Sequence, residues 1–105
     1  MTRDGGEGRT SLTRAGRVRI DYRLDRDGIA TLRHALVSMA RLARAGGAEE
    51  LIGVATPMVR HRTQGADEAT RFAAFEAALA AMDFSPNRGS VFSAHQMGTV
   101  RIGAS

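Results

Sequence analysis

The stretch DRDGIATLRHALVSMARLARAGG, residues 25–47, decides the fold class because it predicts a long amphipathic helix with both ends marked. Residues 25–28 are expected to cap the start of this helix. A carboxylate there can accept hydrogen bonds from free backbone N–H groups and is favoured at the positive end of the helix dipole. Gly46 and Gly47 are expected to end the helix, because glycine reaches the left-handed conformation without steric cost. One apolar stripe follows spacings of three and four: Ile29, Leu32, Leu36, Met39, Ala40 and Ala43.

Short strands are expected on both sides of this helix. Residues 17–23 read RVRIDYR, in which Val18, Ile20 and Tyr22 alternate with charged residues, a pattern typical of a half-buried strand. Residues 49–56 form a short apolar run that suits a buried strand. One crossover could bring the two strands into a single sheet, although the sequence leaves open whether they are neighbours.

A second helix is predicted over residues 68–82, with an apolar stripe of Phe72, Phe75, Leu79 and Met82. Residues 59–67 are polar and aperiodic and indicate a loop, whereas residues 91–93 suit a short strand. Residues 1–16 hold four glycines and few apolar side chains, so we expect a flexible lead-in. The prediction is a small α+β domain over residues 17–105, with short strands and two amphipathic helices.

Composition excludes several classes of function. Cys 0 rules out a disulfide framework and a thiolate metal site, and no apolar run reaches the roughly 18 residues of a membrane span. The net charge of +4 comes from 15 arginines that are scattered along the chain among acidic residues, and aromatic content is 5%, so no nucleic-acid partner is expected. No apolar signal segment opens the sequence, so a cytoplasmic location is expected. Arg33, Arg41 and Arg44 lie off the helix stripe and are expected to stay in water.

Side chains that can do chemistry gather in residues 91–103, VFSAHQMGTVRIG. His95 is the leading candidate, because a neutral imidazole can take up a proton and return it near physiological pH. By spacing alone, the preferred alternative is an ordinary, partly buried histidine bonded to a backbone carbonyl. Gly98 and Thr99 could let the backbone approach a ligand closely. His34 and His61 have no metal-ligand spacing to His95, so we expect neither a metal site nor a hydrolase.

The run Ser93-Ala94-His95-Gln96-Met97-Gly98-Thr99, with Arg101 and Gly103, resembles the S-A-H-Q-M-G-T-C-R-M-G motif of glucose-methanol-choline (GMC) oxidoreductases, which are FAD-dependent enzymes that oxidise alcohols. The likeness extends back to about Gly16, where a strand, an apolar helix and the Ala45–Ala48 turn are similar to the family's C-terminal substrate domain. It is specific over the last eleven positions, in which Val100 and Ile102 replace the usual Cys and Met.

The resemblance implies that His95 accepts the hydroxyl proton of an alcohol substrate while hydride passes to FAD, in an oxidase or a dehydrogenase. Gly98 and Thr99 would lie in a turn near the cofactor. The family's FAD-binding G-x-G-x-x-G and its second catalytic residue have no counterpart in these 105 residues, which implies a fragment truncated at both ends. We therefore expect the isolated chain to hold no FAD and to be inactive, with the remaining part of a split protein as a partner. The second hypothesis is a stand-alone, non-catalytic α+β interaction module, and the third is an arginine-rich nucleic-acid binder.

Overall fold

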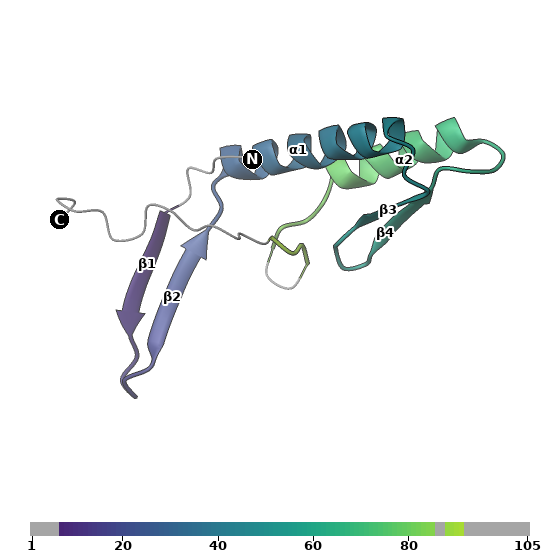
Figure 1. Cartoon of the computed structure of the whole chain (residues 1–105). Helices are drawn as coiled ribbons and strands as arrows, with labels where there is room; N and C mark the ends of the chain where they lie inside the picture. The colour runs from purple at the N-terminus through teal and green to yellow at the C-terminus, as the bar shows by residue number, and fades with distance from the viewer. Residues whose placement is uncertain (1–6, 86–87, 92–105) are drawn as a thin grey trace.

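The structure is a computed structural model that describes residues 7–85 and 88–91. It contains two helices and two small antiparallel sheets, so the predicted α+β class is confirmed (Figure 1). The elements in chain order are β1 (Glu7–Leu12), β2 (Val18–Arg23), α1 (Arg26–Ala45), β3 (Glu50–Gly53), β4 (Val59–Arg62) and α2 (Glu68–Ala80).

The body of the molecule is formed by α1 and α2, which lie side by side and cover one face of the β3–β4 hairpin (Figure 1). The predicted stripe of the second helix is confirmed, because all four of its members are buried between these layers. The core consists of Ala40, Leu51, Phe72, Phe75, Leu79 and Met82. In α1 the stripe is less complete, since Met39 is 59% exposed.

Both predicted ends of α1 are confirmed. The Asp25 carboxylate accepts a hydrogen bond from the backbone N–H of Gly28 at 2.6 Å, which satisfies one of the free donors of the first turn. At the other end Gly47 has φ +84° and its N–H bonds to the carbonyl of Arg44, while the N–H of Ala48 bonds to the carbonyl of Ala43. This left-handed glycine turn reverses the chain directly into β3.

The β3–β4 hairpin corrects the prediction of a loop over residues 59–67, because β4 occupies Val59–Arg62. Its register pairs Leu51 with His61 and Gly53 with Val59, and these residues face the helices. Gly53 allows a close approach, since a Cβ there would lie 2.7 Å from the side chain of Leu79. The expected strand over residues 49–56 is shorter than predicted and ends at Gly53.

The β1–β2 hairpin corrects the prediction of a lead-in without regular structure. Glu7–Leu12 forms β1, which pairs with β2 over its whole length, from Glu7 opposite Arg23 to Leu12 opposite Val18. The strands on either side of α1 therefore belong to two separate hairpins and not to one sheet.

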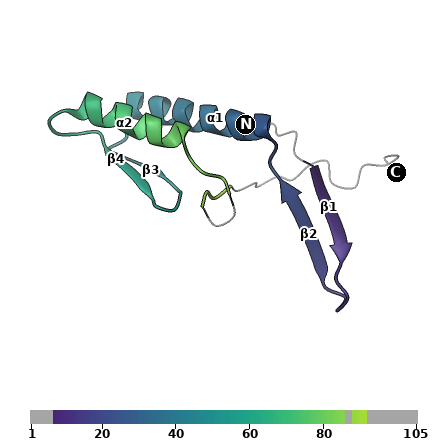
Figure 2. The same cartoon turned by 180° about the vertical axis from the view of Figure 1, so that it is seen from behind.

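This hairpin projects away from the body, which Figure 2 shows from behind. The Cα radius of gyration is 17.5 Å, whereas a compact domain of this size has roughly 13 Å. Among the described elements, neither helix packs extensively on β1 or β2. The structure therefore consists of a small packed body and an exposed arm.

We predict that Leu79→Ala lowers the free energy of unfolding by about 2–5 kcal/mol, because the side chain fills the space between α2 and β3. Leu79 is 2% exposed, whereas Leu42 on α1 is 75% exposed. Leu42→Ala is the matched control and should change stability by no more than about 0.5 kcal/mol. Urea denaturation followed by circular dichroism measures both, and equal losses would contradict the packing described for the body.

Candidate functional site

The site residues predicted from the sequence, His95, Gly98 and Thr99, lie in residues 92–105, outside the described residues. Most of the strand expected over residues 91–93 lies there as well, and Val91 itself is not part of a strand. Just before this segment, Gly89 forms an antiparallel bridge with Ala55, and the N–H of Thr56 bonds to the carbonyl of Arg88 at 2.7 Å. Residues 88–90 therefore lie beside residues 54–56, which directly follow β3.

Within the described residues, the densest group of ionisable side chains joins three elements. Glu68, at the start of α2, accepts hydrogen bonds from both Nε and Nη2 of Arg44 on α1. Its Oε1 also lies 2.9 Å from Nε2 of His61 on β4. The carboxylate thus links both helices to the sheet.

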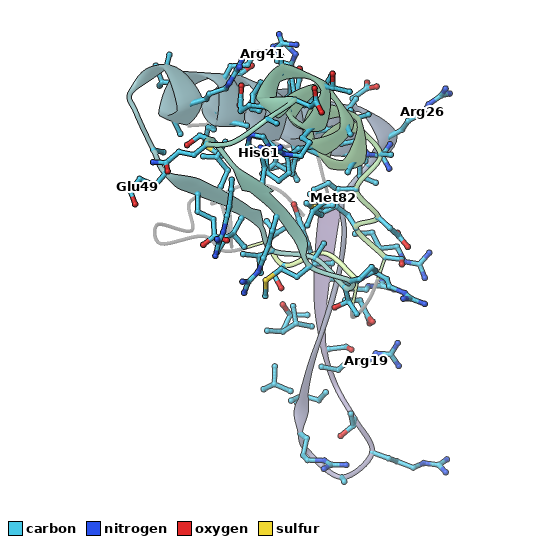
Figure 3. The ribbon with its side chains drawn as sticks, turned by 90° about the vertical axis from the view of Figure 1, so that its right-hand side faces the viewer. Arg19, Arg26, Arg41, Glu49, His61 and Met82 are labelled. Atoms are coloured by element: carbon cyan, nitrogen blue, oxygen red, sulfur yellow. The ribbon has the colours of Figure 1, made fainter. Side chains whose placement is uncertain are left out.

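His61 is held deep in the body, where its side chain is only 2% exposed. The imidazole lies between the helices and the β3–β4 hairpin (Figure 3). Its ring centroid is 5.3 Å from that of Phe72 and 5.6 Å from that of Phe75. The Arg44 guanidinium stacks over the Phe72 ring at 4.4 Å, a cation–π geometry.

The electrostatics of this group centre on the charge of Glu68. The hydrogen bond from Arg44 lowers the pKa of Glu68 below its ordinary value, an effect that partial burial opposes and that the His61 hydrogen bond assists. The same bond raises the pKa of Arg44. Glu68 therefore remains ionised and Arg44 remains charged at neutral pH.

Sequence reasoning placed His61 in a polar loop and missed this group. Two signals were present. In residues 59–62, VRHR, arginine alternates with other residues with the period of a strand, and Glu68 lies seven positions after His61. The imidazole is only 2% exposed, packs against two aromatic rings and is bonded to a carboxylate, which favours a structural role over a catalytic one. The group acts as a structural bond between layers.

Two other arginines bind main-chain carbonyls. Arg33 on α1 donates from Nε and Nη2 to the carbonyl of Met82, at 3.0 and 2.8 Å, and so holds the chain that leaves α2. Arg71 donates to the carbonyls of Ala66 and Gln64 and holds the loop before α2. The prediction for Arg33 and Arg44 was thus wrong, whereas Arg41 is exposed, as predicted, and pairs with Glu76.

The described residues do not fit FAD. Dinucleotide sites place a glycine-rich turn between a strand and a helix N-terminus that receives the pyrophosphate. Here the N-terminus of α1 carries the Asp25 cap and Asp27 in its first turn, and negative charge at this position repels phosphate. The described sheets are antiparallel hairpins, which lack the parallel strands of that fold.

Metal and small-molecule sites are also poorly supported in the described part of the chain. No three His, Asp or Glu side chains gather there as metal ligands. An open hollow of 440 Å³ lies beside β4 and α2. The Arg71 guanidinium at its rim is already bonded to main-chain carbonyls.

Comparison with known proteins identified no relative: no family model matches the chain, and no curated protein or solved structure matches it. Among the described residues, neither helix is long and apolar enough to cross a membrane.

We predict that the Glu68 group makes stability depend on pH in the acid range. The pKa of Glu68 is lower in the folded chain than its ordinary value of 4.5, so its contribution is present above that value and is lost as pH falls through the folded pKa. Glu68→Gln keeps an acceptor but removes the charge. This substitution should lower the free energy of unfolding at neutral pH. It should also reduce the further loss of stability as pH falls into the acid range.

Urea midpoints measured at a series of pH values test this prediction. Glu49→Gln is the control, because Glu49 is exposed, directly precedes β3 and has no ion pair with another described residue. In Glu49→Gln the urea midpoint should depend on pH as it does in the unmodified chain. An equally steep decline in Glu68→Gln would assign the acid sensitivity to other carboxylates.

Proposed function

We propose that this chain supplies the proton-accepting histidine of an FAD-dependent oxidoreductase that acts on CH–OH groups. One observation carries the proposal: the run from Ser93 to Gly103, SAHQMGTVRIG, matches the GMC motif at all positions except Val100 and Ile102. In that motif the histidine is the residue that meets the alcohol. His95 is its counterpart here.

The chemistry required of His95 is proton acceptance. A neutral imidazole takes the hydroxyl proton of the alcohol, so that the carbinol carbon can release hydride and become a carbonyl carbon. FAD, when bound in the complete enzyme, supplies the hydride acceptor. Because the described residues do not fit FAD, the proposal assigns its binding to other parts of the enzyme.

The order of elements over residues 18–47 supports the proposal. The resemblance implies a strand, an apolar helix and a glycine turn over residues 16–48, and the structure has β2, α1 and the Gly46–Gly47 turn in that order. Several large apolar side chains are also uncovered, as expected for part of a larger domain. Outside the β1–β2 hairpin they include Met39, Leu42, Ile52, Val54, Met58 and Val91.

The same uncovered side chains favour a second candidate function, a non-catalytic interaction module whose partner covers them. The two candidates differ in what the gene encodes after residue 105. A following segment that contains the family's second catalytic residue and a G-x-x-N-P-like flavin contact would favour the oxidoreductase. A stable, monodisperse 105-residue product without such a segment would favour the module.

We predict that His95→Ala in the complete oxidoreductase abolishes flavin reduction by alcohol, because no base remains to accept the hydroxyl proton. Anaerobic mixing with an alcohol, followed by the flavin absorbance, measures the rate directly. His34→Ala is the matched control, since His34 is an exposed histidine on α1. This variant should retain the full rate, and full retention in His95→Ala would remove the assignment of His95 as the base.

The isolated 105-residue chain should be purified without flavin and should not oxidise alcohols in the presence of added FAD. Absorbance and fluorescence of the purified chain measure bound flavin. A stoichiometric flavin spectrum would overturn the assignment of FAD binding to other parts of the enzyme.

A further inference from the structure

The projecting β1–β2 hairpin has one apolar and one charged face. Its register places Leu12 opposite Val18 and Thr10 opposite Ile20, and side chains of directly opposed residues share a face. On this face Leu12 is 72% exposed, Val18 is 65% exposed and Ile20 is 72% exposed. The opposite face carries charged residues, among them Arg19, which Figure 3 shows on the projecting arm.

Positive charge is concentrated in the outer part of the hairpin. Residues 8–20 contain four arginines and no carboxylate, whereas the next seven residues contain three aspartates and two arginines. The four are Arg9, Arg14, Arg17 and Arg19. Arg19 pairs with Asp21, but among the described residues no carboxylate pairs with Arg14 or Arg17 at the tip.

The tip has a defined shape. The N–H of Thr13 bonds to the carbonyl of Arg17 at 2.8 Å, and the N–H of Arg17 bonds to Oγ1 of Thr13 at 3.0 Å. Gly16 closes the turn with φ +71°. Arg14 and Arg17 therefore lie directly beside the outermost apolar pair, Leu12 and Val18.

The exposed apolar side chains and the arginines at the tip of the hairpin together distinguish between kinds of partner. A second copy of the chain would bring a like-charged arm to an arm, and electrostatic repulsion opposes that contact. A nucleic acid would neutralise the arginines but leave Leu12, Val18 and Ile20 in water. An anionic lipid surface accepts both features, because apolar side chains enter the boundary between headgroups and acyl chains while arginines meet the phosphates.

We propose that the tip of the β1–β2 hairpin binds the surface of an anionic phospholipid bilayer. Leu12 and Val18 enter the interface, and Arg14 and Arg17 contact lipid phosphates at the headgroup level. The helical body stays in water, where Arg44 is bonded to Glu68 and where Arg33 and Arg71 are bonded to main-chain carbonyls. This inference rests on the hairpin and not on His95, so it stands or falls separately from the oxidoreductase proposal.

Co-sedimentation of the full chain with vesicles tests the proposal. The chain should bind vesicles that contain phosphatidylglycerol, remain unbound with pure phosphatidylcholine, and bind more weakly as salt rises. Arg14→Gln and Arg17→Gln should each weaken binding about five-fold, the equivalent of ~1 kcal/mol for each arginine near the surface. Arg60→Gln and Arg62→Gln remove the same charge from β4 and should weaken binding less.

A second measurement reports insertion of the tip. The chain has Trp 0, so Leu12→Trp introduces a single reporter whose emission should shift to the blue on anionic vesicles. Leu42→Trp is the matched control, because Leu42 on α1 is similarly exposed and should show no shift. Leu12→Ser should reduce vesicle binding, and Leu42→Ser should not.

Three results would overturn the proposal. The first is equal binding to anionic and neutral vesicles, and the second is binding that the hairpin variants leave unchanged. The third is competition by free glycerol phosphate at concentrations comparable to the lipid, which would indicate a site for a soluble phosphate. If a DNA duplex bound the folded chain while anionic vesicles did not, the arm would be a nucleic-acid contact instead.

Discussion

The body of this protein depends on the carboxylate of Glu68. It lies where α1, α2 and β4 meet, and it receives the Arg44 guanidinium from one helix and the His61 imidazole from the sheet. The His61 imidazole is almost fully buried beside two phenylalanine rings. If this carboxylate were absent, the imidazole would lose its hydrogen bonds to water on folding and gain none in their place. Since the bond joins β4 to both helices, the aromatic core and the polar contact stabilise the same arrangement.

The helices could be predicted from sequence because their signals are local. The spacing of Phe72, Phe75 and Leu79 identifies the buried face of α2, and Asp25 marks the start of α1 within three residues of the N–H group that it caps. The strands that were missed carry weaker local signals, of which the four-residue alternation in β4 is one. In β4 the only buried polar side chain is that of His61, and its burial depends on a glutamate from another element. In β1 the apolar face includes Gly8 and Thr10, so the strand is recognisable only from its pairing with β2.

The candidate site shows a different limit of sequence reasoning. Spacing alone favours an ordinary histidine at position 95, and only the resemblance to a family motif makes His95 the preferred catalytic candidate. The structure describes the chain up to Val91 and so reaches the approach to this motif. By contrast, His61 was assigned to a loop from sequence, yet it belongs to the polar group around Glu68, the most connected among the described residues. Its role in layer packing depends on contacts between segments that no short motif encodes.

The separation of the β1–β2 hairpin from the body has a consequence for cooperativity. An isolated two-stranded hairpin is marginally stable in water, and the described helices give it little support. Its amide hydrogens should therefore exchange through frequent local opening, while those of α2 and β3 should exchange only when the body unfolds. We therefore expect the described part of the chain to unfold as two unequal units joined at residues 24 and 25, of which the smaller can open without disturbing the core.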